Sequence, residues 1–236
     1  RSTRTTTLFP YTTLFRSREV YKQEIIDKFR TVASASVADA VDQLVGARGY
    51  MDYPIKPRIN DKKVVGPAVT VKEVKTTESV PPSHALEAID EAPEGSVVVI
   101  GIEGSDPNVA VWGGLMTAGA VARNLAGAIL DAGLRDVTEI KRDFGFPVFS
   151  RTISPGTTVG RYKTEALNVP VQCGGILVHP GDLIVADTDG VVVVPVDHVE
   201  EVLAKSLEIE CREAEQTKYI REVRSLREGI ARYNRI

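Results

Sequence analysis

Cysteine is scarce in this sequence, and its scarcity limits the kinds of site that the chain can carry. Only Cys173 and Cys211 occur among 236 residues, and they lie in segments of different character. Two isolated cysteines cannot form a disulfide framework, and they lack the paired spacing of a cysteine zinc site. The fold is therefore expected to depend on an apolar core, which a chain of this length is long enough to bury.

The sequence also lacks a long apolar run and an excess of basic residues. No stretch approaches the roughly 20 apolar residues that a membrane-spanning helix needs. The formal net charge is −3, from 29 Lys and Arg against 32 Asp and Glu. Because phosphate binding needs clustered Lys and Arg, this balance argues against nucleic acid as the main partner. We expect a soluble, cytoplasmic protein that binds neither membrane nor nucleic acid.

Residues 1–17 (RSTRTTTLFPYTTLFRS) differ in character from the rest of the chain. They contain three Arg and no acid, and they show no helical or strand periodicity. Residues 7–17 resemble the conceptual translation of a sequencing adapter, so we interpret 1–17 as a non-native segment. A transit peptide, which is also rich in Arg, Ser and Thr, is the alternative. In either case residues 18–236 are expected to form a single domain, and without the three Arg its formal net charge is −6.

The hydrophobic pattern predicts alternating strands and helices, followed by a strand-rich part. Continuous apolar runs at 97–100 and 126–130 are typical of strands buried on both faces. The other predicted strands are 64–74, 147–150, 169–172, 176–178, 183–186 and 191–194, and the predicted helices are 18–32, 36–46, 83–92, 110–125, 137–144 and 198–233. The last helix is expected to break once or twice. The predicted fold class is α/β.

The most informative stretch is residues 112–139, WGGLMTAGAVARNLAGAILDAGLRDVTE. The glycine pair Gly113-Gly114 precedes a predicted helix, so its backbone can approach a ligand closely and offer N–H groups to an anion. The strand at 126–130 leads into a predicted polar turn at 131–136, which contains Arg135-Asp136. Since ligands of open α/β folds bind beyond the carboxyl ends of strands, we expect both pairs to face one crevice.

Arg135 and Asp136 suit the binding of a 2-oxo acid. A guanidinium binds a carboxylate in bidentate fashion, and an aspartate supplies a hard oxygen ligand to Mg²⁺ or Mn²⁺. The metal would stabilise the enolate that forms when a carbon–carbon bond breaks. A structural alternative remains open: Asp136 would be a helix N-cap with Glu139 at the third position, and Arg135 would form a surface ion pair.

The same stretch resembles the signature of the RraA-like family. That family includes 4-hydroxy-4-methyl-2-oxoglutarate aldolases and the regulator of ribonuclease activity A. In its pattern a glycine-acid pair is followed, after twenty residues, by Arg-Asp, and here residues 115–134 separate Gly114 from Arg135. The resemblance also covers SVADA (36–40), VGPAVTV (65–71), HPGDLIVAD (179–187) and DGVVVVP (189–195), so it spans nearly all of 30–200.

The resemblance implies a layered β/β/α swivelling-domain fold, here with a long C-terminal helix. It implies that Gly113, Gly114, Leu115 and Met116 form a substrate-binding loop. Arg135 would be catalytic and bind the substrate carboxylate, and Asp136 would be catalytic and hold the metal. It further implies a homotrimer or hexamer with sites near subunit interfaces. The implied activity is pyruvate-releasing retro-aldol cleavage of 4-hydroxy-4-methyl-2-oxoglutarate-type substrates, with oxaloacetate decarboxylation as a related activity.

The chain departs from the family pattern at one position, because Gly114 stands where the pattern has an acid. Asp106, Glu103 or an acid of a neighbouring subunit could replace the missing carboxylate. The departure favours a rival hypothesis, a non-catalytic regulator that binds a ribonuclease or helicase. A methyltransferase acting on a menaquinone precursor is a further rival, but the chain lacks a glycine-rich loop after an early strand with a downstream acid.

Overall fold

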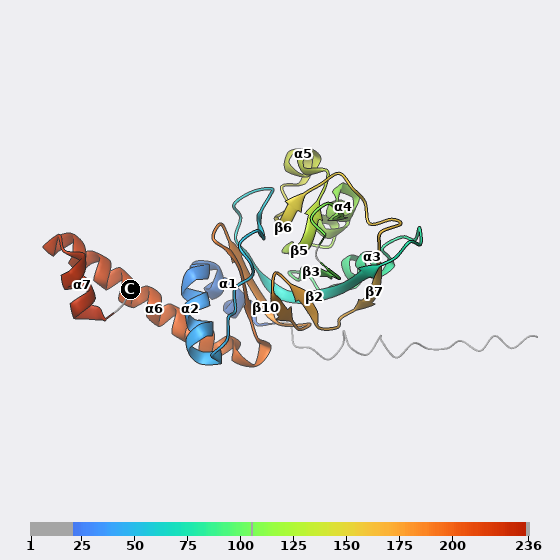
Figure 1. Ribbon diagram of the computed structural model, residues 1–236. Helices are drawn as coiled ribbons and strands as arrows, with labels where there is room; N and C mark the ends of the chain where they lie inside the picture. The colour runs from blue at the N-terminus through green and yellow to red at the C-terminus, as the bar shows by residue number, and fades with distance from the viewer. Residues whose placement is uncertain (1–20, 105, 235–236) are drawn as a thin grey trace, which may run out of the picture.

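The structure, a computed structural model, describes residues 21–104 and 106–234. The interpretation of residues 1–17 as non-native therefore lies outside the described residues. The main sheet follows the order β1-β6-β5-β3-β2-β10-β11, and two further strands pair with it off this path, β4 with β5 and β7 with β2. Figure 1 shows this sheet at the centre of the body, with helices on two separate sides and a helical arm projecting from it.

The middle of the sheet is parallel. Its strands are β2 (Val64–Lys75), β3 (Val97–Ile102), β5 (Gly127–Leu134) and β6 (Val148–Ile153), with the short β4 (Ala110–Trp112) beside the end of β5. The segments that connect them contain α3 (Ser83–Glu91), α4 (Gly114–Ala122), α5 (Val137–Glu139) and the π-helical turn Ile140–Phe144. Because the parallel strands run in one direction, the segments that follow β4 and β5 meet at the same edge of the sheet.

Antiparallel strands curve the sheet until its two ends meet. They are β1 (Lys56–Pro57), β7 (Tyr162–Leu167), β10 (Leu183–Asp187) and β11 (Gly190–Val194), and β8 (Val171–Cys173) pairs separately with β9 (Ile176–Val178). At the ends, the N–H of Met51 donates to the carbonyl of Val191 at 2.9 Å, and Lys56 donates to the carbonyl of Asp189. The result is a nearly closed sheet, in which β10 and β11 form a hairpin.

Three apolar cores follow from this curvature. One fills the inside of the curved sheet and includes Ile129, Phe149 and Ile184. A second lies outside β3 and β5, beneath α3 and α4, and includes Leu130 and Trp112. The third lies outside β10 and β11 and is covered by α1 (Gln23–Thr31), α2 (Ser34–Val45) and the first half of α6 (Val199–Val223). Alternating residues of one strand therefore serve different cores, which explains why the central strands read as continuous apolar runs.

Most predicted elements are present, but three predictions near the glycine pair and α2 are wrong. The helix expected over 110–125 begins only at Gly114, because residues 110–112 form β4 and Trp112 pairs with Leu134. The polar turn expected from Asp131 begins only after Leu134, since β5 continues that far and Asp131 is buried in an ion pair. The helix expected to start at residue 36 starts at Ser34, and the Ser36 hydroxyl lies within it and donates to Glu210.

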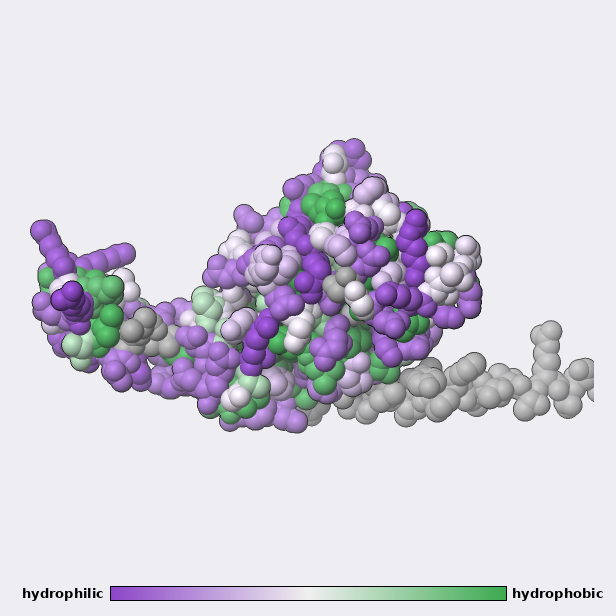
Figure 2. Space-filling view, viewed as in Figure 1, coloured by the Kyte–Doolittle hydropathy of each residue, from purple (hydrophilic) through white to green (hydrophobic). Residues whose placement is uncertain are grey.

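The predicted long C-terminal helix is confirmed, with one break. A short 3₁₀ turn, Val196–His198, leads into α6, and α7 (Leu226–Tyr233) follows a residue in left-handed conformation, Arg224 with φ of 55°. The outer half of α6 and α7 form the arm in Figure 1, and Figure 2 shows apolar side chains at its tip on a largely hydrophilic surface. Across the described residues, none of the helices is both long and apolar enough to span a bilayer.

Candidate active site

The start of α4 is held in place by a buried hydrogen-bond chain. The indole N–H of Trp112 donates to the Thr117 hydroxyl at 2.8 Å, and that hydroxyl donates to the Gly113 carbonyl at 3.0 Å. The Trp112 ring also stacks on Phe146, with ring centroids 6.2 Å apart and an interplanar angle of 6°. A side chain that fills this space with a satisfied N–H fixes the first turn of the helix. The glycine pair that begins this helix is buried at the edge of the sheet.

Arg135 and Asp136 lie directly beside this glycine pair. The backbone N–H of Arg135 donates to the carbonyl of Trp112 at 3.0 Å, which joins the ends of β4 and β5. The Asp136 carboxylate Oδ2 accepts from the N–H of Gly114 at 3.0 Å. The structure therefore brings together the two pairs that the sequence predicts to share a crevice.

Asp136 occupies the N-cap position of α5, but its side chain does not cap that helix. The carboxylate instead turns back across the sheet edge to the first turn of α4. Its backbone is left-handed, with φ of 59°, a conformation that costs energy for a residue with a Cβ. The cap function proposed as the structural alternative for Asp136 is therefore wrong, and the orientation of this carboxylate needs another reason.

Glycine at position 113 leaves room for the Asp136 carboxylate. A Cβ built there would lie 2.6 Å from Asp136 Oδ2, closer than real Cβ atoms approach, and 3.0 Å from Arg135 Nε. Any larger residue would push both charged groups away from the helix start. The glycine at 113 thus sets how closely Arg135 and Asp136 approach the backbone.

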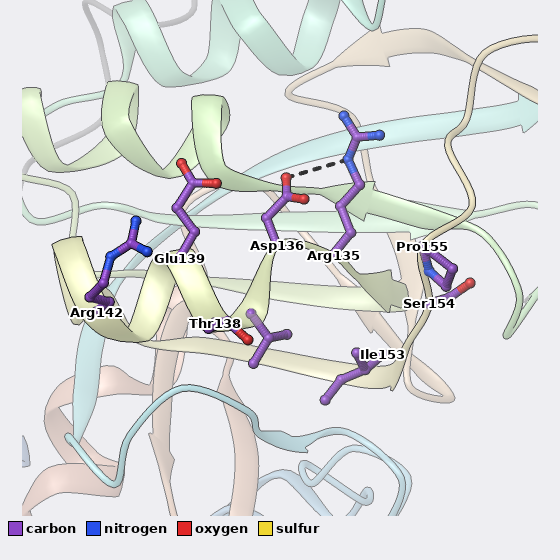
Figure 3. Close-up of a pocket in the computed structure, with 9 residues that line it drawn as sticks. Arg135, Asp136, Thr138, Glu139, Arg142, Ile153, Ser154 and Pro155 are labelled. Carbon is purple, nitrogen blue, oxygen red and sulfur yellow. Dashed lines mark ion pairs between the residues drawn. The ribbon is translucent and has the colours of Figure 1, made fainter.

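Arg135 is only partly engaged by its neighbour. Its Nε lies 3.6 Å from Asp136 Oδ2, and the two side chains are 44% and 40% exposed. Figure 3 shows the terminal nitrogens of the guanidinium pointing away from Asp136. Guanidinium N–H groups therefore face solvent, next to a carboxylate and a helix N-terminus, where a small anion could approach.

A pocket of about 600 Å³ opens beside these residues. Its lining is formed by Arg135, Asp136, Val137, Thr138, Glu139, Arg142, Ile153, Ser154 and Pro155 (Figure 3). Arg142 is occupied by an ion pair with the adjacent Asp143, Nε to Oδ1 at 2.6 Å. Arg135 is thus the lining arginine that is better placed for a carboxylate ligand.

The predicted loop residues do not all belong to this pocket. Gly113 and Gly114 contact Asp136 through their backbone, but Leu115 is 90% exposed and Met116 packs against the core beneath α4. Neither side chain lines the pocket. Leu115 and Met116 can contribute backbone N–H groups of the first helical turn, which have no acceptor within a helix.

Sequence reasoning treated Glu139 only as a helix-start residue and missed its proximity to Gly114. A Cβ built at Gly114 would lie 2.8 Å from Glu139 Oε1. The acids considered from the sequence lie elsewhere: Glu103 accepts from the N–H of Lys75, and Asp106 from the N–H of Asn108. The available signal was the spacing, because residues three apart share a helix face, and Glu139 follows Asp136 by three.

The site offers two carboxylates to a cation, from Asp136 and Glu139. In the parts of the chain that the structure describes, no cluster of three or more His, Cys, Asp or Glu is arranged to hold a metal ion. Mg²⁺ and Mn²⁺ suit oxygen ligands, and Mg²⁺ often keeps several waters while binding one or two carboxylates. The chemistry of this donor set and the open pocket beside it fit such an ion.

Comparisons with known proteins agree with this architecture. The RraA-like family, described as Aldolase/RraA, matches residues 34–193. A protein of Halalkalibacterium halodurans named "Putative 4-hydroxy-4-methyl-2-oxoglutarate aldolase" is 37% identical over 186 residues, which cover 78% of this chain and 82% of that protein.

Two solved structures resemble the chain over most of its length. An uncharacterized protein from Pseudomonas syringae pv. tomato has a TM-score of 0.80 and 28% identity, covering 98% of this chain and 100% of that one. RraAS2 of Streptomyces coelicolor, described as an unusual member of the RNase ES inhibitor RraA protein family, has a TM-score of 0.73 and 27% identity, covering 84% and 97%. The expected fold is thereby confirmed, and the chain belongs to the RraA-like family.

Proposed function

We propose that the chain is a divalent-metal-dependent lyase that releases pyruvate from 4-hydroxy-4-methyl-2-oxoglutarate or a similar 2-oxo acid. The observation that carries the proposal is the Asp136 carboxylate, which bonds to the Gly114 N–H beside Arg135 instead of capping its own helix. The aldolase name of the Halalkalibacterium halodurans relative supports the same reaction class. Decarboxylation of oxaloacetate, which also breaks the bond next to C3 of a 2-oxo acid, is the proposed related activity.

The proposed roles follow from the placement of the residues. Arg135 binds the carboxylate at C1 of the substrate with its exposed guanidinium, and the N–H groups at the start of α4 donate to the carboxylate or keto oxygen. Asp136 and Glu139 would hold Mg²⁺ or Mn²⁺. When bound, the ion supplies Lewis-acid stabilisation of the negative charge that develops on the keto oxygen.

Bond breaking then proceeds without any redox change. The C4 hydroxyl loses its proton to a water held near Arg135, the C3–C4 bond breaks, and its electron pair remains on C3 as an enolate. The C4 fragment leaves as one pyruvate, and protonation of C3 gives the second. In oxaloacetate the same bond breaks and CO₂ leaves, so no hydroxyl proton has to be removed.

We also propose that the active assembly is a homotrimer or hexamer. Leu115 is 90% exposed and Ile153, in the pocket lining, is 57% exposed. Apolar side chains at the border of a site would be covered by a neighbouring subunit. Sedimentation velocity of the purified chain tests this, and a monomer at micromolar concentration would contradict it.

The activity is tested by measuring pyruvate release from 4-hydroxy-4-methyl-2-oxoglutarate and from oxaloacetate. Samples would contain Mg²⁺, Mn²⁺ or EDTA, and the variants would be Asp136→Ala and, as a control on an exposed carboxylate of α3, Glu87→Gln. We expect turnover that disappears with EDTA and with Asp136→Ala but persists in Glu87→Gln. Absence of metal-dependent turnover above the solution rate in the folded protein would contradict the proposal.

A second candidate function is regulation of a ribonuclease. It is favoured by the glycine at 114, which removes a carboxylate from the family pattern, and by the description of the Streptomyces coelicolor relative. If this candidate is correct, the chain would inhibit purified RNase ES at stoichiometric concentration, with or without EDTA, and would form no pyruvate.

A further inference from the structure

Glu139 lies in the space that a side chain at position 114 would otherwise occupy. A Cβ built on Gly114 would be 2.8 Å from Glu139 Oε1 and 3.1 Å from Oε2. Both carboxylate oxygens therefore lie against the glycine backbone. Position 113 repeats the arrangement, because a Cβ there would be 2.6 Å from Asp136 Oδ2. Two consecutive glycines at the start of α4 each admit one carboxylate from the α5 turn.

The two carboxylates extend from the same side of the α5 turn. Figure 3 shows the Asp136 and Glu139 side chains pointing in the same direction, toward the beginning of the neighbouring helix. Carboxylate oxygens are the ligands that Mg²⁺ and Mn²⁺ prefer, and Mg²⁺ is often bound by one or two of them together with waters. The basic residue one turn further, Arg142, forms its ion pair with Asp143. Two carboxylates that extend toward one helix start therefore suit a divalent cation.

We propose that Glu139 is the second carboxylate of the cation site, in place of the acid that is missing at position 114. This proposal rests on the proposed function, because it assumes that the lyase uses a divalent cation. The proposal implies that the second carboxylate ligand comes from position 139 in this chain and from position 114 where the family pattern has its acid. A side chain at 114 would place its Cβ 2.8 Å from Glu139 Oε1, so the Glu139 carboxylate would have to shift.

The first test is a titration with Mn²⁺ alone, followed by the electron paramagnetic resonance signal of free Mn²⁺. The full chain would be compared with Asp136→Asn, Glu139→Gln and the control Glu87→Gln. We expect Glu139→Gln and Asp136→Asn to weaken Mn²⁺ binding about 10-fold or more, while Glu87→Gln binds as the unchanged chain does. Binding by Glu139→Gln as tight as that of the unchanged chain would overturn the proposal.

The second test moves the carboxylate. Glu139→Ala removes it, and the double variant Gly114→Asp/Glu139→Ala supplies it from the other position with room for the new side chain. We expect the double variant to bind Mn²⁺ at least 5-fold more tightly than Glu139→Ala. Both variants should give the circular dichroism spectrum of the unchanged chain. If they then bind Mn²⁺ equally weakly, a carboxylate at 114 does not replace the one at 139, which would count against the proposal.

The outcomes separate this proposal from the proposed function. If the unchanged chain binds no Mn²⁺, both proposals fail. If Mn²⁺ binds and depends on Glu139 but neither substrate yields pyruvate, the cation site stands and the lyase does not. If pyruvate forms with metal while Glu139→Gln binds Mn²⁺ normally, the lyase stands and the role of Glu139 is lost.

Discussion

Arg135 offers a guanidinium whose Nε faces Asp136, while its terminal nitrogens point away from that carboxylate and are open to a ligand. Arg135→Lys keeps the charge but loses the planar fork that matches a carboxylate. A hydrogen bond to a charged group contributes roughly 1.5–3 kcal/mol, so we expect kcat/KM for 4-hydroxy-4-methyl-2-oxoglutarate to fall about 10- to 100-fold, mainly through KM. Steady-state kinetics would measure this, with Arg123→Gln at the exposed end of α4 as the control. An unchanged KM in Arg135→Lys would remove Arg135 from substrate binding.

Glu73 is a buried residue outside the proposed site, and its ionisation affects the stability of the fold. Its side chain is 1% exposed, and neither carboxylate oxygen has a hydrogen-bond partner among the described residues. Burial raises the pKa of this carboxyl from the usual 4.5 to about 8. The folded state therefore holds a proton that the unfolded chain releases above pH 4.5, and stability falls with rising pH until the folded state also ionises near pH 8.

We expect this single group to change the free energy of unfolding by about 1.4 kcal/mol per pH unit between pH 5 and 8. Glu73→Gln removes the ionisation, so the variant should lose this slope and become more stable than the unchanged chain above pH 8. Urea unfolding at several pH values measures both. Parallel pH profiles for the two proteins would show that Glu73 ionises normally in the folded state.

At the scale of elements, β5 joins the core to the site through a buried ion pair. Arg151 Nε donates to Asp131 Oδ1 at 2.7 Å, and the two side chains are 18% and 9% exposed. Burial raises the pKa of the Asp131 carboxyl, although the bond to Arg151 opposes the shift. Asp131 lies on β5 four residues before Arg135, which directly follows that strand, so this pair joins β5 to β6 near the site.

Removing only Arg151 from the ion pair should lower the free energy of unfolding more than replacing both charged residues by apolar ones. Arg151→Met leaves a buried carboxylate without its partner, and we expect a loss of about 3–5 kcal/mol in the free energy of unfolding. The double variant Asp131→Leu/Arg151→Met should recover most of that loss, because neither charge remains buried. Guanidinium unfolding of both variants measures the difference. Equal stability of the single and double variants would show that the uncompensated charge is not the cause.

The elements also show how much of the site could be predicted from the sequence. The buried strand, the glycine pair and the Arg-Asp pair could be placed at one sheet edge because strand order and chain direction constrain them. The pattern could not reveal that β5 continues through Asp131, because a charged residue at the end of an apolar run normally marks a turn. In the structure, Arg151, twenty residues later, pairs with Asp131 and compensates its charge. The proximity of Glu139 to Gly114 had one signal, the three-residue spacing from Asp136, but the same spacing also fits an ordinary helix start.

For the whole molecule, the strand-rich second part could be predicted but its closure could not. The hairpin β10–β11 follows from local turn residues, whereas its pairing with β2 joins segments more than 100 residues apart. The strand β7 was not predicted, because its sequence YKTEAL mixes charged and apolar residues and its partner is the distant β2. Family resemblance supplied this long-range information, and the observed fold agrees with it.

The helical arm is the part of the molecule that contributes least to the cores. Helix α7 packs on the outer half of α6, where Gly229 contacts Ile220, and Leu226 is 62% exposed. Removal of residues 224–236 should therefore lower the free energy of unfolding by less than about 1 kcal/mol. Urea unfolding of the truncated chain tests this, and a loss above about 3 kcal/mol would mean that the arm is part of the cooperative fold.

Exchange of the methyl protons of pyruvate in D₂O tests the proposed lyase most directly, because it requires the same enolate whichever substrate is natural. Proton nuclear magnetic resonance would follow the methyl signal with Mg²⁺, with EDTA and with Asp136→Asn. We expect the signal to decay faster with the chain and Mg²⁺ than in buffer with Mg²⁺ alone, and the acceleration to disappear with EDTA and in Asp136→Asn. Exchange no faster than in buffer with Mg²⁺ would contradict a pyruvate enolate at this site.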